Sequence, residues 1–223
     1  KTDKDDALKL ARLVLLGQLK AVHMPDLATR EHRSLIKYRK TLDQRIGRLK
    51  NTIRALFANR GIEISRGSKA WFSGRKQLDA HRRPLADCSP DELWRGQLDL
   101  ELLQLDALNA QLAEVERRLD SMAKQDDRIR RVQTIPGVGR KTAEVLVTAL
   151  DDVDRFENGR QVSAYLGLVP RQYQSGETDR NGRITKRGSR LLRTMLLECA
   201  WASLRYNPWA KAVYKRMCGG EKT

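Results

Sequence analysis

A run of cationic side chains follows a loop serine, Ser175, in the last quarter of the chain. A serine that attacks a phosphodiester needs cations to hold the phosphate and to stabilise the charge that develops on its oxygens, and it needs its own proton removed. Arginine suits phosphate because its planar guanidinium forms two parallel hydrogen bonds. The pattern allows Ser175 to act as a nucleophile, while the cations alone equally fit a solvated or nucleic-acid-binding face without catalysis. Six Lys and Arg residues lie within the next 18 positions: Arg180, Arg183, Lys186, Arg187, Arg190 and Arg193.

A second candidate is a glycine turn with the sequence Ile-Pro-Gly-Val-Gly, which contains Gly137 and Gly139. We predict that one helix ends near Thr134 and that the next begins near Arg140. Glycine permits positive φ and close backbone approach, and the unpaired N–H groups at a helix start favour an anion. With Arg140 and Lys141 beside it, the turn resembles the DNA-binding helix-hairpin-helix, which contacts phosphates without reading base sequence. The alternative is a tight helix–helix turn without a ligand.

Two carboxylates, Asp3 and Asp6, are three positions apart near the start of the chain. On a helix they share a face and could hold a divalent metal ion from one side. Taken without a family resemblance, they fit better as partners of the positive end of a helix dipole.

Composition bounds the classes of partner. The chain has 223 residues, enough for one or two domains, and 44 Lys and Arg against 28 Asp and Glu give a net charge of +16. Such an excess indicates a polyanionic partner, with nucleic acid favoured over an acidic membrane surface. No apolar run approaches the roughly 20 residues that span a bilayer. Three widely spaced cysteines argue against a disulfide framework or a zinc site and indicate a reducing, cytoplasmic location.

Two leucine heptad patterns predict a pair of long helices. Residues 27–60 carry ten Lys and Arg and two acids, with Arg39 as a polar seam position, whereas residues 91–127 carry ten acids and four bases, with Asn109 in the seam. Opposite charges favour an antiparallel coiled-coil hairpin. Pairing with a second copy of the protein and simple core packing are the alternatives. The seam positions are Leu35, Leu42, Ile46, Leu49, Ile53 and Leu56 in the first pattern, and Leu98, Leu102, Leu105, Leu112 and Leu119 in the second.

The remaining segments complete a mainly α fold. We predict a helix over residues 3–20, and a long connection with one short helix over residues 61–90, which ends with Ser89 as the N-cap of the second long helix. Residues 128–223 should form a helix, the glycine turn, a second helix, a loop, and a helix from about Ser189 to Arg205. The five aromatic residues Tyr38, Tyr165, Tyr173, Trp201 and Trp209 fit packing better than base stacking, and no role is assigned to the three histidines.

Four strings in fixed order carry a family resemblance: Ile-Pro-Gly-Val-Gly, Tyr-Leu-Gly-Leu-Val-Pro, Ser-Gly, and Gly-Arg-Ile-Thr-Lys-Arg-Gly. The chain resembles insertion-sequence transposases that combine a DEDD (RuvC-like) acidic tetrad with a catalytic serine, bridge-RNA-guided recombinases related to the pilin gene-inverting recombinase. The resemblance implies a RuvC-like remnant at residues 1–26, a coiled-coil arm at 27–127 and a serine transposase domain with the helix-hairpin-helix at 128–223.

The resemblance also implies roles for individual residues. Ser175 would attack DNA and form a phosphoserine link that frees a 3′ hydroxyl, and Asp3 and Asp6 would be the last two tetrad ligands of Mg²⁺. In the family, the other two ligands of the tetrad lie upstream of the matched segment. We therefore expect this chain to be part of a longer protein and to be inactive by itself. The implied partners are DNA, a guide (bridge) RNA and further copies of the protein, which would form a dimer or tetramer through the coiled coil. No membrane partner is implied. The alternatives are a non-catalytic helix-hairpin-helix binding module with coiled-coil dimerisation, and a structural dimerisation protein.

Overall fold

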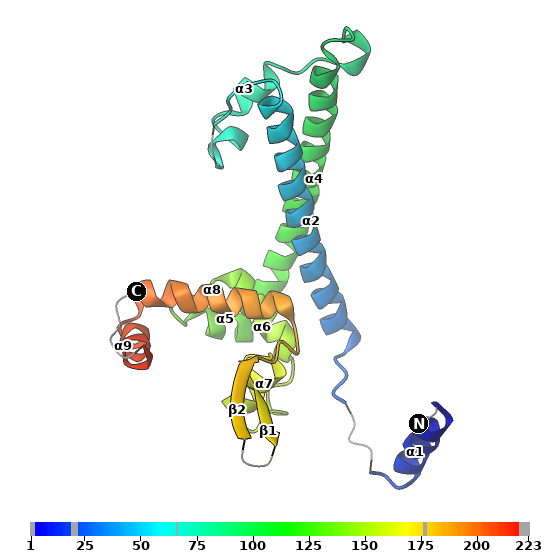
Figure 1. Cartoon of the computed structure of the whole chain (residues 1–223), viewed down its shortest axis with the longest axis vertical. Coiled ribbons are helices and arrows are strands. Elements are labelled where there is room, and N and C mark those ends of the chain that lie inside the picture. The colour runs from blue at the N-terminus through cyan, green and yellow to red at the C-terminus, as the bar shows by residue number, and fades with distance from the viewer. Residues whose placement is uncertain (1–2, 19–21, 66, 176–177, 219–223) are drawn as a thin grey trace.

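The computed structural model describes residues 3–18, 22–65, 67–175 and 178–218. Within these residues the fold is mainly helical, as predicted, with one small β-hairpin (Figure 1). No described helix is both long and apolar enough to cross a membrane. The elements in order are α1 (Asp3–Leu15), α2 (Leu27–Ala58), α3 (Arg75–Asp79), α4 (Leu93–Gln125), α5 (Asp127–Gln133), α6 (Arg140–Leu150), α7 (Gly159–Tyr165), β1 (Pro170–Ser175), β2 (Thr178–Ile184), α8 (Arg190–Tyr206) and α9 (Pro208–Met217).

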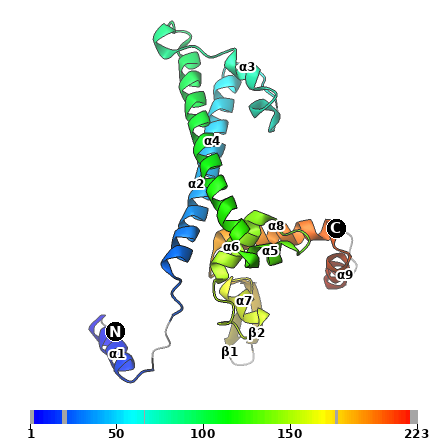
Figure 2. The ribbon, with the colours of Figure 1, turned by 180° about the vertical axis from the view of Figure 1, so that it is seen from behind.

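The two heptad segments form α2 and α4, which pack side by side in an antiparallel pair (Figures 1 and 2). Leu42 and Ile53 of α2 and Leu98 and Leu102 of α4 are fully buried, so the leucine seam is the core of this arm. The prediction of Asn109 in the seam is wrong: Asn109 is exposed, and the buried side chain there is Leu108.

The connection between α2 and α4 contains α3 and two 3₁₀ turns, Lys69–Trp71 and Leu85–Asp87. The Arg75 guanidinium donates two hydrogen bonds to the Asp106 carboxylate, each with an N–O distance of 2.8 Å, and this pair ties the connection to α4. Ser89 is not the N-cap, because α4 begins at Leu93 with Glu92 at the cap position and no side-chain cap bond.

The first helix is shorter than predicted. Helix α1 ends at Leu15, where Gly17 takes φ +62 and its N–H and that of Gln18 bond to the carbonyls of Val14 and Leu13. No residue of α1 is buried, and Figures 1 and 2 show it apart from the helix pair. Residues 19 and 20 of the predicted helix lie outside the described residues.

The C-terminal unit packs α5, α6, α7 and α8 at one end of the arm (Figure 2). Helix α8 matches its predicted bounds, and the Ser189 hydroxyl caps it by accepting a hydrogen bond from the Leu192 N–H. The predicted loop before α8 is wrong in kind, because it contains α7 and the two-stranded hairpin, and α9 was not predicted.

A buried ion pair joins the arm to this unit. Glu144 of α6 is fully buried, and its carboxylate accepts a hydrogen bond from Arg39 of α2 at 2.8 Å and lies 3.1 Å from His32 Nε2. Arg33 donates to the carbonyls of Thr148 and Ala149 at the end of α6. Arg39 is therefore polar within the seam because its partner lies in α6 rather than in α4.

Candidate active site and nucleic-acid interface

The β-hairpin places Ser175 at the end of β1, next to its turn. The strands are antiparallel, with Tyr173 opposite Arg180 and Ser175 opposite Thr178. Opposed residues share a face and side chains alternate along each strand. Ser175, Tyr173 and Arg180 therefore lie on one face, together with Arg171.

The Ser175 side chain is exposed, and no hydrogen bond holds its hydroxyl among the described residues. The serine oxygen is thus open to a substrate rather than enclosed in an apolar interior. Asp179, the one acid among the described residues of the hairpin, lies opposite Gln174 and faces the other side. The described residues of the hairpin therefore place cations, but no carboxylate, on the serine face.

Two glycines position the base of the hairpin. Gly167 (φ +69) and Gly188 (φ +84) lie where the chain after α7 crosses the chain before α8. A Cβ on Gly167 would meet the Arg187 backbone nitrogen at 2.5 Å, and a Cβ on Gly188 would meet the Tyr165 carbonyl at 2.4 Å. The glycines of the two family strings are thus required for this crossing.

The basic residues after Ser175 divide into two groups. Arg193 belongs to the scaffold, since its Nη1 donates to the carbonyls of Leu166 at 3.2 Å and Gly188 at 2.9 Å. The others are exposed and form no ion pair within the part of the chain that the structure describes: Arg180, Arg183, Lys186, Arg187 and Arg190.

The glycine turn between α5 and α6 has the predicted bounds, with α5 ending at Gln133 and α6 beginning at Arg140. Gly137 (φ +93) packs against α8, where a Cβ would lie 3.0 Å from the Cys199 carbonyl, so this glycine has a packing role. Gly139 is the N-cap of α6 and has open space around it.

The cations beside this turn already have partners. Arg140 forms an ion pair with Asp120, and Lys141 forms one with Glu116, both on α4. The turn therefore fastens the C-terminal unit to the arm, and its contact with phosphate stays a prediction.

The two predicted metal ligands, Asp3 and Asp6, lie exposed in the first turn of α1. They provide two carboxylates at most, and the described residues contain no cluster of three or more His, Cys, Asp or Glu side chains that could hold a metal ion. The residues described here do not by themselves fit a Mg²⁺ site, and no step is derived through a metal.

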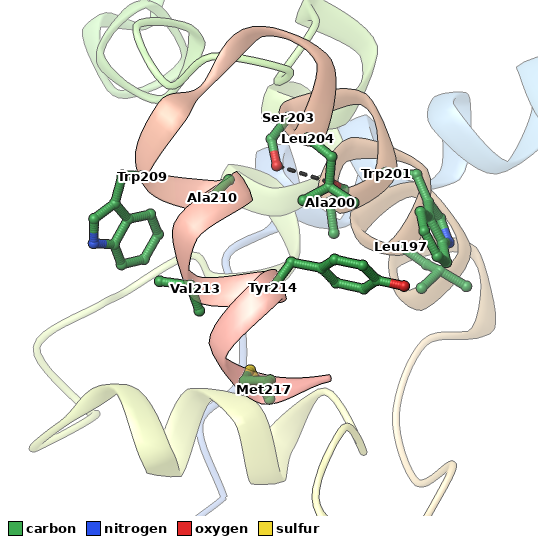
Figure 3. Close-up of a pocket in the computed structure, with 10 residues that line it drawn as sticks. All are labelled: Leu197, Ala200, Trp201, Ser203, Leu204, Trp209, Ala210, Val213, Tyr214 and Met217. Atoms are coloured by element: carbon green, nitrogen blue, oxygen red, sulfur yellow. Dashed lines mark hydrogen bonds between the residues drawn. The ribbon is translucent and has the colours of Figure 1, made fainter. Parts of the chain in front are cut away.

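None of the five aromatic residues is in the core, but the predicted packing is seen for Tyr165 against Phe156 and for Trp201 against Tyr214, with ring centroids 5.4 and 6.0 Å apart. Tyr38, Tyr165, Tyr173, Trp201 and Trp209 are between 42% and 72% exposed. Figure 3 shows that the two tryptophans and Tyr214 line an apolar groove between α8 and α9, which sequence analysis missed because α9 was not predicted.

None of the three histidines lies at the hairpin. His23 is 2.8 Å from Asp151, His32 is beside Glu144, and the His81 ring packs edge-on against Phe57. They contribute to packing and polar contacts elsewhere.

Comparison with known proteins indicates the family. Residues 129–215 match the model of the transposase IS116/IS110/IS902 family. Over 97% of its length, the chain is 31% identical to the transposase for insertion sequence element IS1111A of Coxiella burnetii. Residues 129–215 thus carry the match to the IS116/IS110/IS902 transposase family, and the similarity to one insertion-sequence transposase extends along nearly the whole chain.

Two further relatives agree with the predicted resemblance to insertion-sequence transposases and to the pilin gene-inverting recombinase, which is confirmed. The pilin gene-inverting protein of Moraxella lacunata is 26% identical over 79% of this chain and 44% of its own length. The transposase for insertion sequence element IS1328 of Yersinia enterocolitica is 41% identical over 40% of the chain and 27% of its own length. The chain spans 60% of the length of the IS1111A transposase.

Proposed function

We propose that this protein cuts and rejoins DNA through a covalent phosphoserine intermediate at Ser175. The observation that carries the proposal is the exposed Ser175 side chain on the same hairpin face as Arg180. Among the described residues its hydroxyl has no hydrogen-bond partner, and the cations that follow it have no acidic partner.

The chemistry follows from that placement. The Ser175 oxygen attacks a phosphorus atom of a DNA strand, and the serine proton passes to a general base of the protein. The bond from that phosphorus to the 3′ oxygen breaks. The 3′ oxygen leaves as a hydroxyl after taking a proton, and the phosphate stays on the serine. The 3′ hydroxyl of another strand reverses the step, so the number of phosphodiester bonds is unchanged and no nucleotide triphosphate is consumed.

The cations hold the reacting phosphate. Arg180 is diagonal to Ser175 on the shared face, a separation that a guanidinium can span, and it offers paired donors to the phosphate oxygens. Preorganised donors of this kind stabilise the charge that builds on those oxygens in the transition state. Arg183, Lys186, Arg187 and Arg190 extend the positive surface along the adjoining backbone.

We propose that the proton acceptor is a separate acidic group that approaches the serine face. The proposal is in keeping with that face, which carries no carboxylate among the described residues. We assign Asp3 and Asp6 to that partner site as Mg²⁺ ligands. The isolated chain is therefore proposed to be inactive in strand transfer, and measurable transfer with Mg²⁺ would contradict this.

The larger assembly forms part of the same proposal. Residues 1–26 would adjoin a RuvC-like domain, the arm at 27–127 would join copies of the protein, and residues 128–223 would present the serine. A guide RNA would direct the choice of DNA, inside the cytoplasm. In this proposal Gly137, Gly139, Arg140, Lys141 and Arg193 also lie at the nucleic-acid interface.

The test is covalent trapping in the whole protein whose reading frame includes this chain. A labelled DNA substrate should give a denaturant-resistant protein–DNA adduct, which Ser175→Ala abolishes while DNA binding stays within about twofold. Ser121→Ala, a change of another exposed serine on α4, is the matched control and should retain the adduct. An adduct that persists in Ser175→Ala contradicts the proposal, and tight binding without any adduct favours the non-catalytic binding module.

A further inference from the structure

A second cationic surface lies at the far end of the arm from the hairpin. Residues 44–78 contain nine Lys and Arg and one acid. Helix α2 has 32 residues, so this end lies about 48 Å from the start of the helix at 1.5 Å per residue. Figure 1 shows the connection with α3 at one end of the pair and the β-hairpin at the other.

Four residues form what we call the distal platform: Lys50, Arg54, Trp71 and Phe72. Lys50 Nζ lies 5.3 Å from the centroid of the Trp71 ring, and Arg54 Cζ lies 5.0 Å from it. Arg54 also donates to the Gly67 carbonyl at 2.6 Å, which fixes its guanidinium. Phe72, next in the chain, is 77% exposed.

The two cations are held together without a neutralising acid. Lys50 and Arg54 are four residues apart on one helix face, and neither forms an ion pair with any residue that the structure describes. Burial and the charge of Arg54 together lower the pKa of Lys50. An anion placed beside both groups would relieve this repulsion.

The neighbouring tryptophan shows the contrast. Arg60 and Arg95 lie 5.9 and 5.7 Å from the centroid of the Trp94 ring, but Arg95 also pairs with Glu92 at 3.6 Å. The Trp94 cluster is therefore partly neutralised, whereas the distal platform is not.

We propose that the distal platform binds a single-stranded nucleic acid, with a base stacked on Phe72 and the adjoining phosphates on Lys50 and Arg54. Exposed aromatic rings near cations hold unpaired bases without reading sequence, and Phe72 directly follows Trp71, the ring over which Lys50 and Arg54 lie. A duplex keeps its base faces stacked inside, so it would use the cations and leave the ring unused. This inference goes beyond the proposed function and holds whether or not Ser175 attacks DNA.

The test measures binding of the chain to a short oligothymidylate, an oligouridylate and a blunt duplex of equal length by fluorescence anisotropy. Phe72→Ala should weaken both single strands by roughly five- to a hundredfold, as expected for the loss of one stacked base, and leave the duplex within twofold. Leu103→Ala, which removes another exposed apolar side chain on α4, should change neither. A preference between the two oligonucleotides tells whether DNA or RNA is the better ligand.

Salt dependence isolates the cations. The double change Lys50→Gln with Arg54→Gln should reduce the slope of log affinity against log salt for single strands by about 1.4, since each phosphate contact contributes about 0.7. The control is Lys4→Gln with Lys9→Gln on α1, which removes the same charge and should leave the slope within about 0.3 of the unchanged chain. The proposal is overturned if Phe72→Ala binds single strands like the unchanged chain, if it weakens the duplex equally, or if both double variants lower the slope alike. Ser175→Ala should bind like the unchanged chain, which separates this result from the failure of the proposed chemistry.

Discussion

The glycine turn before α6 and the β-hairpin before α8 look alike in sequence and differ in structure. Both combine glycines with Arg and Lys, and both are candidates for phosphate contact. At the turn, Arg140 and Lys141 pair with acids of α4, and Gly137 packs against α8. At the hairpin, Arg180 and Arg183 are exposed and without acidic partners among the described residues.

The difference shows that a cation matters for a ligand only when its charge is not already neutralised inside the fold. The cations of the turn form ion pairs with acids of α4, and these ion pairs fasten the C-terminal unit to the arm. The hairpin keeps its charge and places it beside an open hydroxyl. The predictions below separate these two uses, beginning with the largest expected effect.

Arg39→Ala should lower the free energy of unfolding by about 3 kcal/mol, because it removes the arginine partner of buried Glu144 and leaves that carboxylate with His32 alone. Denaturant unfolding followed by circular dichroism measures this. Arg45→Ala, on the exposed side of the same helix, should cost less than about 0.5 kcal/mol. Equal costs for the two variants would show that the ion pair does not anchor α6 to the arm.

Gly188→Ala should destabilise the chain by about 2–3 kcal/mol, because the new Cβ clashes with the Tyr165 carbonyl and the backbone has positive φ. It should also weaken DNA binding, since the base of the hairpin moves. Gly159→Ala, at the start of α7 where a Cβ meets open space, is the control and should be neutral in both assays. A neutral Gly188→Ala would remove the packing explanation of this glycine.

The double change Arg180→Gln with Arg183→Gln should reduce the salt slope of duplex binding by about 1.8, from two contacts of about 0.9 each. The same change at Arg140 and Lys141 should reduce it by less than half as much, because those cations are paired. Anisotropy titrations over a range of salt give both slopes. A larger reduction of the salt slope in the Arg140 and Lys141 variant than in the Arg180 and Arg183 variant would show that the turn, and not the hairpin, contacts the phosphates.

Asp126→Asn tests the smallest effect, at the start of α5. Hydrogen bonds from Arg128 lower the pKa of Asp126. A lowered carboxyl pKa contributes stability that is present above the unfolded value near 4 and is lost as pH falls through the folded value. Since the site is partly exposed, we expect a loss of about 0.5 kcal/mol at pH 7 that disappears near pH 2. Because an Asn oxygen can still cap the helix, a loss that is equal at both pH values would show that the Asp126 charge is not the source of the effect.

Periodicity and turn residues predicted much of this structure. The heptads gave α2 and α4, and the glycine turn was placed to within one residue, because both depend on local pattern. Arg39 was recognised as a polar seam position, but its partner Glu144 is 105 positions away and belongs to a different helix. The acidic partners of Arg140 and Lys141 and the packing of Gly137 against α8 could not be predicted either, because these contacts join residues that are distant in the sequence.

The hairpin itself was predicted only as a loop. Its strands carry Gln, Arg, Asn and Ser without alternating apolar residues, so neither periodicity nor strand propensity indicates them. Ser175 was identified from its chemistry and from the family strings, and its exposure on the cationic face came from the strand register. The distal platform was missed because its aromatic residues and cations are distant in sequence from any motif.

The central claim is that the Ser175 oxygen becomes bonded to DNA phosphorus. Mass spectrometry of the trapped adduct, after digestion with nuclease and protease, tests it most directly. The account predicts a phosphonucleotide mass on the peptide that contains Ser175 and on that serine alone. A nucleotide attached to any other residue, or an active protein that never carries one, would contradict it.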